Sequence, residues 1–221
     1  MSRHHKGFVK VEAAIFDIGN VLVLFDYMKA ANRLALKNGL HSVPDRAIIT
    51  AANHEFELGR TTRADFLATV RREFQDTGRE EEFVAIWEDI FEENIRMTSF
   101  ARELSLRMPV FLISNIGEIH HRHLFNKFDV FSVFRDKIFS YLDGIMKPDA
   151  AVFQLAISRF GVNPAATVYI DDVQENCAAA STAGFLGLHY DHARQDLPQA
   201  WGIETVSRGP SAILEDRAFL S

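Results

Sequence analysis

Two largely apolar segments of the chain run directly into aspartate residues. The first, at 11–16, is followed by Asp17, and the second, at 168–170, is followed by Asp171 and Asp172. Neighbouring strands of an open parallel sheet end at the same edge, and ligands bind in the crevice outside that edge. We therefore expect the acidic side chains to converge on one pocket, which favours a metal-assisted active site.

The size and charge of the chain limit what the protein can be. Its 221 residues, 48% of them hydrophobic, suffice for one large domain or for a core domain with a sizeable insertion. The 24 basic and 30 acidic residues give a net charge of −6, which disfavours nucleic acid as a partner. Because Cys177 is the only cysteine, no intramolecular disulfide can form, and we expect a buried thiol in a reducing compartment.

The sequence gives no sign of a membrane segment. No stretch approaches the roughly 20 apolar residues that a membrane-spanning helix needs. The basic residues at 1–7 are followed by a short segment that Lys10 and Glu12 interrupt, and not by a continuous apolar region. We therefore expect a cytoplasmic protein without an export signal and without a membrane partner.

The order of the expected helices and strands predicts an α/β fold. With the first strand at 11–16, the later strands are expected at 109–113, 137–141, 167–170 and 185–190, and they alternate with helices at 119–128, 149–160 and 174–183. This alternation predicts a Rossmann-like parallel sheet with right-handed crossovers. Residues 26–98 show helical periodicity instead, which predicts an all-helical insertion of four helices, the last of them including Phe91.

Four short motifs lie at the ends of these strands or in nearby loops. They are Asp17, Ser114-Asn115, Lys147-Pro148 and Asp171-Asp172. Each motif alone is weak, because such residues often cap helices, form turns or lie in solvent. In this order and context, however, the four motifs resemble the haloacid dehalogenase superfamily of hydrolases. The resemblance covers essentially the whole chain, and it implies a catalytic core of residues 1–25 and 99–221 with a helical cap at 26–98.

The resemblance implies a mechanism and a set of catalytic residues. Asp17 is the expected nucleophile, and its attack on a phosphate ester would form an aspartyl phosphate that water then hydrolyses. Ser114 and Lys147 are expected to be catalytic and, with Asn115, to bind the substrate, because the Lys147 ammonium offsets gathered negative charge. Asn20 would contact substrate near the nucleophile or serve as a turn residue that tolerates left-handed geometry.

The same resemblance implies a Mg²⁺ site. A phosphomonoester is a dianion, so a carboxylate nucleophile needs a cation between the two negative charges. Mg²⁺ prefers oxygen ligands and retains water, which matches Asp17, the backbone carbonyl of Gly19, and Asp172. Asp171 would be a further ligand or hold a metal-bound water. Asn176 would either orient a metal-bound water or lie on a helix surface.

One position departs from the pattern of the superfamily's phosphatases, which usually carry a second aspartate two residues after the nucleophile as a general acid and base. That position is Gly19 here. General acid–base help is typically worth about 10²–10⁴-fold. The substrate could have a good leaving group, a cap residue or water could replace the acid, or the protein could bind phosphate ligands without turnover. The cap candidates are Asp26, Tyr27, His54, Glu55 and Glu57.

Two reactions of the superfamily compete for this chain. The sequence Asp17-Ile18-Gly19-Asn20 is similar to a bacterial subgroup that includes sugar-1-phosphate phosphatases, which favours a small phosphorylated metabolite as the substrate. The rival is the 2-haloacid dehalogenase reaction, which also uses an aspartate nucleophile but no metal. The pair Asp171-Asp172 argues against it, because without a cation these carboxylates would stand unneutralised beside the nucleophile.

Two further expectations concern the cap and a histidine cluster. The strands that join the cap to the core would lie near 24–27 and 97–100, and closure of the cap would expel water from the pocket. His120, His121 and His123 lie close together in one expected helix. A solvated helix face explains them better than a metal site, because no cysteine is nearby.

Overall fold

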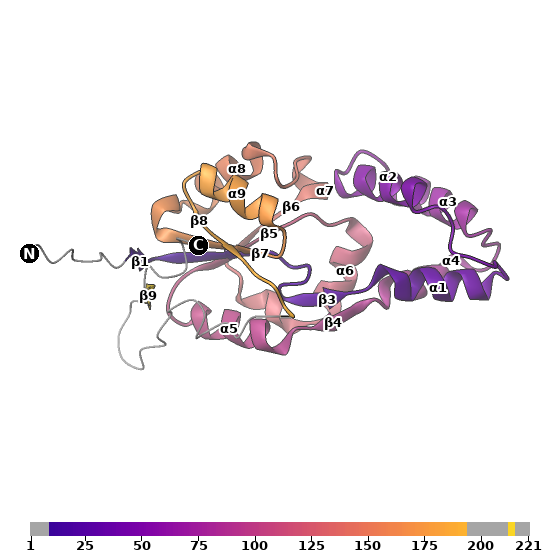
Figure 1. Cartoon of the computed structure of the whole chain (residues 1–221), viewed down its shortest axis with the longest axis horizontal. Helices are drawn as coiled ribbons and strands as arrows, with labels where there is room; N and C mark the ends of the chain where they lie inside the picture. Colours follow the sequence, from indigo (N-terminus) through magenta and orange to yellow (C-terminus); the bar gives the residue numbers. More distant parts are fainter. Residues whose placement is uncertain (1–8, 194–211, 215–221) are drawn as a thin grey trace, which may run out of the picture.

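The structure is a computed structural model that describes residues 9–193 and 212–214. Residues 1–8, 194–211 and 215–221, which the sequence assigns to the core, lie outside the described residues. They include the basic residues at 1–7. Figure 1 shows a central sheet with helices on both faces and a group of further helices to one side. None of the helices described is long and apolar enough to cross a membrane.

A parallel sheet forms the centre of the core (Figure 1). In the described part of the chain it has five strands in the order β6-β5-β2-β7-β8. They are β2 (Ala13–Phe16), β5 (Val110–Ser114), β6 (Asp136–Phe139), β7 (Thr167–Asp171) and β8 (Leu186–His189). β2, β5 and β7 are buried along their whole length, which explains why they read as continuous apolar runs. The parallel sheet expected from the sequence is confirmed.

Helices cover both faces of the sheet (Figure 1). One face packs against α5 (Ile95–Ser105) and α6 (Glu118–Lys127), and the other against α8 (Ala150–Phe160) and α9 (Gln174–Thr182). Gly161 ends α8 with a φ of 64°, the left-handed conformation that favours glycine at this position. Shorter elements complete the core, namely β1 (Val9–Val11), which pairs with β9 (Ala212–Leu214), η1 (Asp129–Val133), α7 (Ser140–Asp143) and η2 (Pro164–Ala166).

The helices to one side of the sheet form a bundle of their own, which we call the cap helices. They are α1 (Tyr27–Lys37), α2 (Arg46–Glu57), α3 (Arg63–Glu73) and α4 (Glu80–Glu88). Asp26, Asp45 and Thr62 begin the first three, because each side chain accepts a hydrogen bond from a backbone N–H of the first turn. The bundle packs around Leu34, Phe66, Phe74, Phe83 and Trp87. Helices in this part of the chain are thus confirmed.

Two expectations about the boundary of the cap are wrong. α4 ends at Glu88, and Phe91 begins β4 (Phe91–Glu93), which pairs antiparallel with β3 (Val23–Phe25). The insertion is therefore not all-helical; the spacing of Trp87 and Phe91 suits a continued helix as well as a new strand. The second connection was expected near 97–100, but these residues lie inside α5, which is packed on the core. The division into cap and core stays a proposal, with the β3–β4 ribbon as the connection.

Candidate active site

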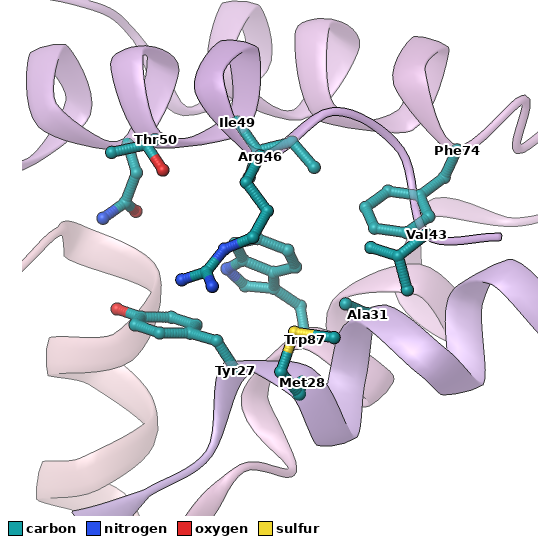
Figure 2. A pocket seen from close by; sticks show the side chains of 10 residues that line it. Tyr27, Met28, Ala31, Val43, Arg46, Ile49, Thr50, Phe74 and Trp87 are labelled. Atoms are coloured by element: carbon teal, nitrogen blue, oxygen red, sulfur yellow. The ribbon is translucent and has the colours of Figure 1, made fainter.

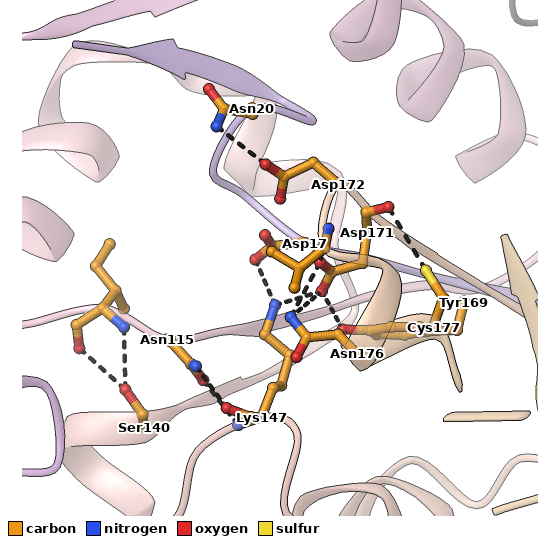
Figure 3. A network of polar contacts seen from close by, with 12 residues as sticks. Asp17, Asn20, Asn115, Ser140, Lys147, Tyr169, Asp171, Asp172, Asn176 and Cys177 are labelled. Atoms are coloured by element: carbon orange, nitrogen blue, oxygen red, sulfur yellow. Dashed lines mark hydrogen bonds and ion pairs between the residues drawn. The ribbon is translucent and has the colours of Figure 1, made fainter. Parts of the chain in front are cut away.

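Strand ends bring three carboxylates to one edge of the sheet (Figure 3). Asp17 follows β2, Asp171 ends β7, and Asp172 comes next in the chain. Because β2 and β7 are hydrogen-bonded neighbours, their carboxyl ends lie side by side. One oxygen from each of the three carboxylates lies within 4.8 Å of the others. The convergence that the strand ends predict is therefore present in the structure.

Lys147 joins two of these carboxylates. Its Nζ lies 2.8 Å from Oδ1 of Asp17 and 2.7 Å from Oδ2 of Asp171, and its side chain is buried. Burial alone would lower the pKa of Lys147, but the two carboxylates raise it above its usual value. The ammonium group therefore stays charged and offsets part of the negative charge at the site.

Asp171 already has hydrogen-bond donors at both oxygens. The Tyr169 hydroxyl and Lys147 donate to Oδ2, the backbone N–H of Val173 donates to Oδ1 at 2.8 Å, and Nδ2 of Asn176 lies 3.0 Å from both oxygens. Burial alone would raise the pKa of Asp171, but Lys147 and these hydrogen bonds lower it below its usual value. Asp171 is thus suited to hold Lys147 and Asn176 in place, and Asn176 is a buried residue rather than one on a helix surface.

Asp17 and Asp172 offer the oxygens that a cation could use. Burial raises the pKa of Asp17 to about 7, against the opposing effect of Lys147. Burial also raises the pKa of Asp172, whose Oδ2 accepts a hydrogen bond of 3.0 Å from Nδ2 of Asn20. Their raised pKa values mean that the two neighbouring carboxylates ionise less readily than usual. A bound divalent cation would stabilise their ionised forms, and their oxygens are ligands of the kind that Mg²⁺ prefers. The residues present therefore fit a Mg²⁺ ion.

Two polar side chains fix the loops at this edge (Figure 3). The Asn115 side chain, expected to bind substrate, forms two hydrogen bonds of 2.9 Å with the backbone N–H and C=O of Lys147. Ser140 was not singled out from the sequence; its Oγ accepts a hydrogen bond of 3.0 Å from the N–H of Ile116. These bonds fix the backbone beside Ser114, whose buried side chain lies at the end of β5.

A cavity of about 300 Å³ lies at this edge, between the core and the cap helices. From the core it is lined by Asp17, Gly19, Ser114, Asn115, Lys147 and Asp172, and from the cap by Tyr27, Asn53 and Glu57. Asn20 is not among the lining residues described. Its side chain binds Asp172 instead, and its φ of 49° is the left-handed geometry expected of a turn residue.

The five cap residues that could replace the missing general acid differ in where they lie relative to the cavity. Tyr27 and Glu57 line the cavity. The Asp26 carboxylate accepts a hydrogen bond of 2.8 Å from a backbone N–H at the start of α1. His54 and Glu55 are exposed, and Nδ1 of His54 lies 3.3 Å from Oε1 of Glu55. Of the five, only Tyr27 and Glu57 are therefore placed to meet a substrate.

The histidine cluster on α6 is not a solvated face, so that expectation is wrong. His120 is buried against Phe91 and Trp87 and lines the cavity, while His121 and His123 are half-buried. The reason is that α6 lies between the sheet and the cap, in contact with α4. Burial lowers the pKa of His120 to about 4, so its imidazole is neutral near pH 7.

Comparisons with known proteins agree with the motifs and the fold. The family model of haloacid dehalogenase-like hydrolases matches residues 11–184. The sesquiterpene phosphatase astK of Aspergillus oryzae is 35% identical over 99 residues, which are 42% of this chain and 48% of that protein. The chain thus matches about half the length of this curated relative.

Solved structures of low sequence identity share the fold. An enzyme of the haloacid dehalogenase family from Bacteroides thetaiotaomicron, in complex with magnesium and inorganic phosphate, has a TM-score of 0.77 at 20% identity, covering 86% of this chain and 98% of that chain. A HAD-like family hydrolase from Porphyromonas gingivalis has a TM-score of 0.71 at 21% identity, covering 86% and 95%. Since the family model covers most of the residues, the chain belongs to the haloacid dehalogenase-like hydrolases.

Proposed function

We propose that the protein is a Mg²⁺-dependent phosphatase that acts on a small phosphorylated metabolite. The observation that carries this proposal is the group formed by Asp17 and Lys147, which are buried, and the half-buried Asp172 on the wall of a cavity between core and cap. The family match supports a hydrolase. The name of the fungal relative, a phosphatase, and the magnesium and phosphate bound to the bacterial structure support this reaction.

Asp17, Asp172 and the backbone carbonyl of Gly19 would hold the Mg²⁺ ion. When bound, Mg²⁺ supplies the positive charge that lets a carboxylate approach a phosphate dianion. Asp171 would not need to contact the ion, because its oxygens already accept hydrogen bonds from Lys147 and other donors. Its role would be to fix the positions of those donors.

The remaining residues of the site act on the phosphate ester. An oxygen of Asp17 attacks phosphorus, which gives an aspartyl phosphate as the bond from phosphorus to the alcohol oxygen breaks, and that oxygen takes up a proton to leave as the alcohol. The Ser114 hydroxyl and the Lys147 ammonium hold the phosphate oxygens and offset their charge. Water then attacks the aspartyl phosphate, so that inorganic phosphate leaves and the Asp17 carboxylate is restored.

We expect hydrolysis of p-nitrophenyl phosphate that is lost on addition of EDTA and restored by excess Mg²⁺. Burial raises the pKa of Asp17 to about 7, so protons compete with the cation at this carboxylate. The apparent Mg²⁺ affinity should therefore increase from about pH 6 to about pH 8. Initial rates measured against Mg²⁺ concentration at each pH test this.

Three measurements distinguish the proposed phosphatase from the alternatives. Full activity after chelation would contradict the proposal. Release of chloride from 2-chloropropionate without metal would identify a dehalogenase. Binding of inorganic phosphate without turnover of any ester would identify a phosphate-binding protein.

A second cavity, inside the cap, bears on the alcohol part of the substrate. It has a volume of about 240 Å³, and Tyr27 and Asn53 line both this cavity and the active-site cavity. Figure 2 shows its walls, and the Arg46 guanidinium extends into it. The apolar side chains among these walls are Met28, Ala31, Val43, Ile49, Phe74 and Trp87.

The apolar walls favour an ester of an apolar alcohol over a sugar 1-phosphate. Sugar hydroxyls that face these apolar side chains would lose hydrogen bonds to water, which costs about 1–3 kcal/mol for each group left without a partner. The polar residues of the lining are Tyr27, Arg46, Thr50 and Asn53. The name of the fungal relative, a sesquiterpene phosphatase, also points to an apolar alcohol. We therefore propose apolar phosphomonoesters as the substrate class and keep sugar 1-phosphates, which the Asp-x-Gly-Asn sequence favours, as the alternative.

We expect the kcat/KM of n-alkyl phosphates to exceed that of glucose 1-phosphate and to increase with chain length. Each methylene buried in the cap cavity is worth about 0.8 kcal/mol, or about fourfold in kcat/KM, until the cavity is full. The variant Ala31→Phe should remove this increase, because the ring fills the cavity, while p-nitrophenyl phosphate serves as the control substrate whose rate stays unchanged. Steady-state kinetics below the micelle concentrations measure both. A higher kcat/KM for glucose 1-phosphate than for every alkyl ester would favour the sugar alternative.

A further inference from the structure

The position two residues after the nucleophile has no room for a side chain unless the ring of Phe25 moves. An added Cβ at Gly19 would lie 2.9 Å from Cε1 of Phe25. The ring of Phe25, on β3, therefore occupies the space where the usual aspartate of the superfamily's phosphatases would begin. If this chain cleaves esters of ordinary alcohols, whose alkoxides leave poorly without a proton, another residue must donate that proton.

The cavity offers few candidates for this role. Among the described lining residues, the titratable groups not already placed at the metal or phosphate are Tyr27, Glu57 and His120. Burial raises the pKa of Tyr27 far above its usual value, so it is too weak an acid. Burial lowers the pKa of His120 to about 4, so it carries no proton to donate from its free ring nitrogen near pH 7. Glu57 is the residue that remains.

Glu57 is held in place and in a suitable protonation state. Nδ2 of Asn53, one turn earlier on α2, donates a hydrogen bond of 2.8 Å to Oε1 of Glu57, which leaves the other carboxyl oxygen for a proton. Burial, with a smaller contribution from the Asp17 carboxylate, raises the pKa of Glu57 to about 7 against the opposing effects of Asn53 and Lys147. A pKa near the working pH suits a group that both donates and accepts a proton.

Close packing of the cap on the core brings the end of α2 to the cavity. An added Cβ at Gly117, at the start of α6, would lie 2.6 Å from the Phe56 ring, and one at Gly59 would collide with the backbone carbonyl of Tyr141. Gly59 also has a φ of 66°, which favours glycine. These contacts flank Glu57 on both sides in the sequence. They fix the residue above the same cavity as Asp17.

From this arrangement we infer that Glu57 is the general acid and base of the reaction, in place of the aspartate absent at position 19. The inference rests on the proposed phosphatase function. As the bond from Asp17 to phosphorus forms and the bond from phosphorus to the alcohol oxygen breaks, the Glu57 proton passes to that oxygen. The Glu57 carboxylate then accepts a proton from the water that attacks the aspartyl phosphate, which returns Glu57 to its protonated form.

The variant Glu57→Gln tests this role, because glutamine keeps the hydrogen bond from Asn53 but cannot donate or accept the transferred proton. We expect its kcat on n-butyl phosphate to fall by about 10²–10⁴-fold. With p-nitrophenyl phosphate, whose leaving group needs no proton, the first release of p-nitrophenolate should keep its rate. A burst should then precede slow turnover, because the second step lacks its base. Stopped-flow absorbance measures the burst.

Glu55→Gln is the matched control, since Glu55 lies on the same helix but is exposed and does not line the cavity in the described structure. It should leave both substrates unaffected, and Glu57→Asp, which keeps an acid, should retain intermediate activity on the butyl ester. Equal loss on both substrates in the first step, no loss in Glu57→Gln, or a wild-type enzyme that turns over only p-nitrophenyl phosphate would each overturn the inference. Absence of any wild-type hydrolysis, even of p-nitrophenyl phosphate, would overturn the proposed function itself.

Discussion

Asp17→Asn is expected to lower the hydrolysis of p-nitrophenyl phosphate by about 10⁴-fold or more, to the background rate. An amide oxygen is too weak a nucleophile to displace the alcohol, and the variant also loses a proposed ligand of Mg²⁺. The protein should stay folded, because Lys147 keeps its 2.7 Å contact with Asp171 and a buried carboxylate whose pKa is raised to about 7 is removed. Steady-state rates and the melting temperature measure the two effects.

Asp129→Asn is a control for this variant, because Asp129 is exposed, pairs with Arg102 and is not among the described residues that line the active-site cavity. It should leave the rate unchanged. A second check is chemical. Rapid quench of the wild-type enzyme with labelled substrate should trap phosphate on the protein, and the Asp17→Asn variant should trap none. A rate of the variant above one tenth of the wild-type rate would contradict a nucleophilic role. Such a small loss corresponds to less than about 1.4 kcal/mol of activation free energy.

The fold could be predicted from the sequence because its core strands carry a simple signal. β2, β5 and β7 are buried throughout, so they read as apolar runs, and β5 and β7 each lead to a helix that begins within a few residues. The β3–β4 ribbon could not be predicted in the same way. Its strands have three residues each, which is too short for a period of two to be distinguished from a helical pattern.

The candidate site was predictable where it follows strand ends and unpredictable where it depends on packing between distant segments. Asp17 and Asp171 are placed by β2 and β7 themselves. Tyr169 was missed, although its position two residues before Asp171 puts both side chains on one face of the strand. The roles of Asn115 and Glu57 depend on which loop or helix packs opposite them, and spacing along the chain carries no signal for that.

Lys147→Met is expected to be the variant with the largest effect on stability. The Lys147 ammonium lies between two buried carboxylates, Asp17 and Asp171. Removing one partner of such a group leaves uncompensated buried charge, which typically lowers the free energy of unfolding by about 3–5 kcal/mol. Phosphatase activity should fall as well, by about 10²–10³-fold, because a donor to the phosphate oxygens is lost. Urea unfolding in EDTA and steady-state kinetics measure the two losses.

The stability loss should depend on pH with a defined sign. In the wild-type protein the pKa of Asp171 is lowered, so this group stabilises the fold above its unfolded pKa, and the contribution is lost as the pH falls. Without Lys147 the pKa values of Asp17 and Asp171 both rise, and these groups destabilise the fold most when they are ionised. The deficit of Lys147→Met should therefore be largest near pH 8 and smaller near about pH 5, where protonation removes the charge.

A double variant identifies the source of the deficit. Lys147→Met combined with Asp171→Asn removes one of the two carboxylates that the ammonium neutralises, while the asparagine oxygen can still accept a hydrogen bond from the Tyr169 hydroxyl. The double variant should thus be more stable than Lys147→Met alone near pH 8, although Asp171→Asn by itself destabilises the wild-type protein. Such a reversal of sign between the two backgrounds is the signature of a direct charge interaction in a double-mutant cycle. Additive losses, or a deficit that grows as the pH falls, would show instead that Lys147 stabilises the fold through the packing of its aliphatic chain.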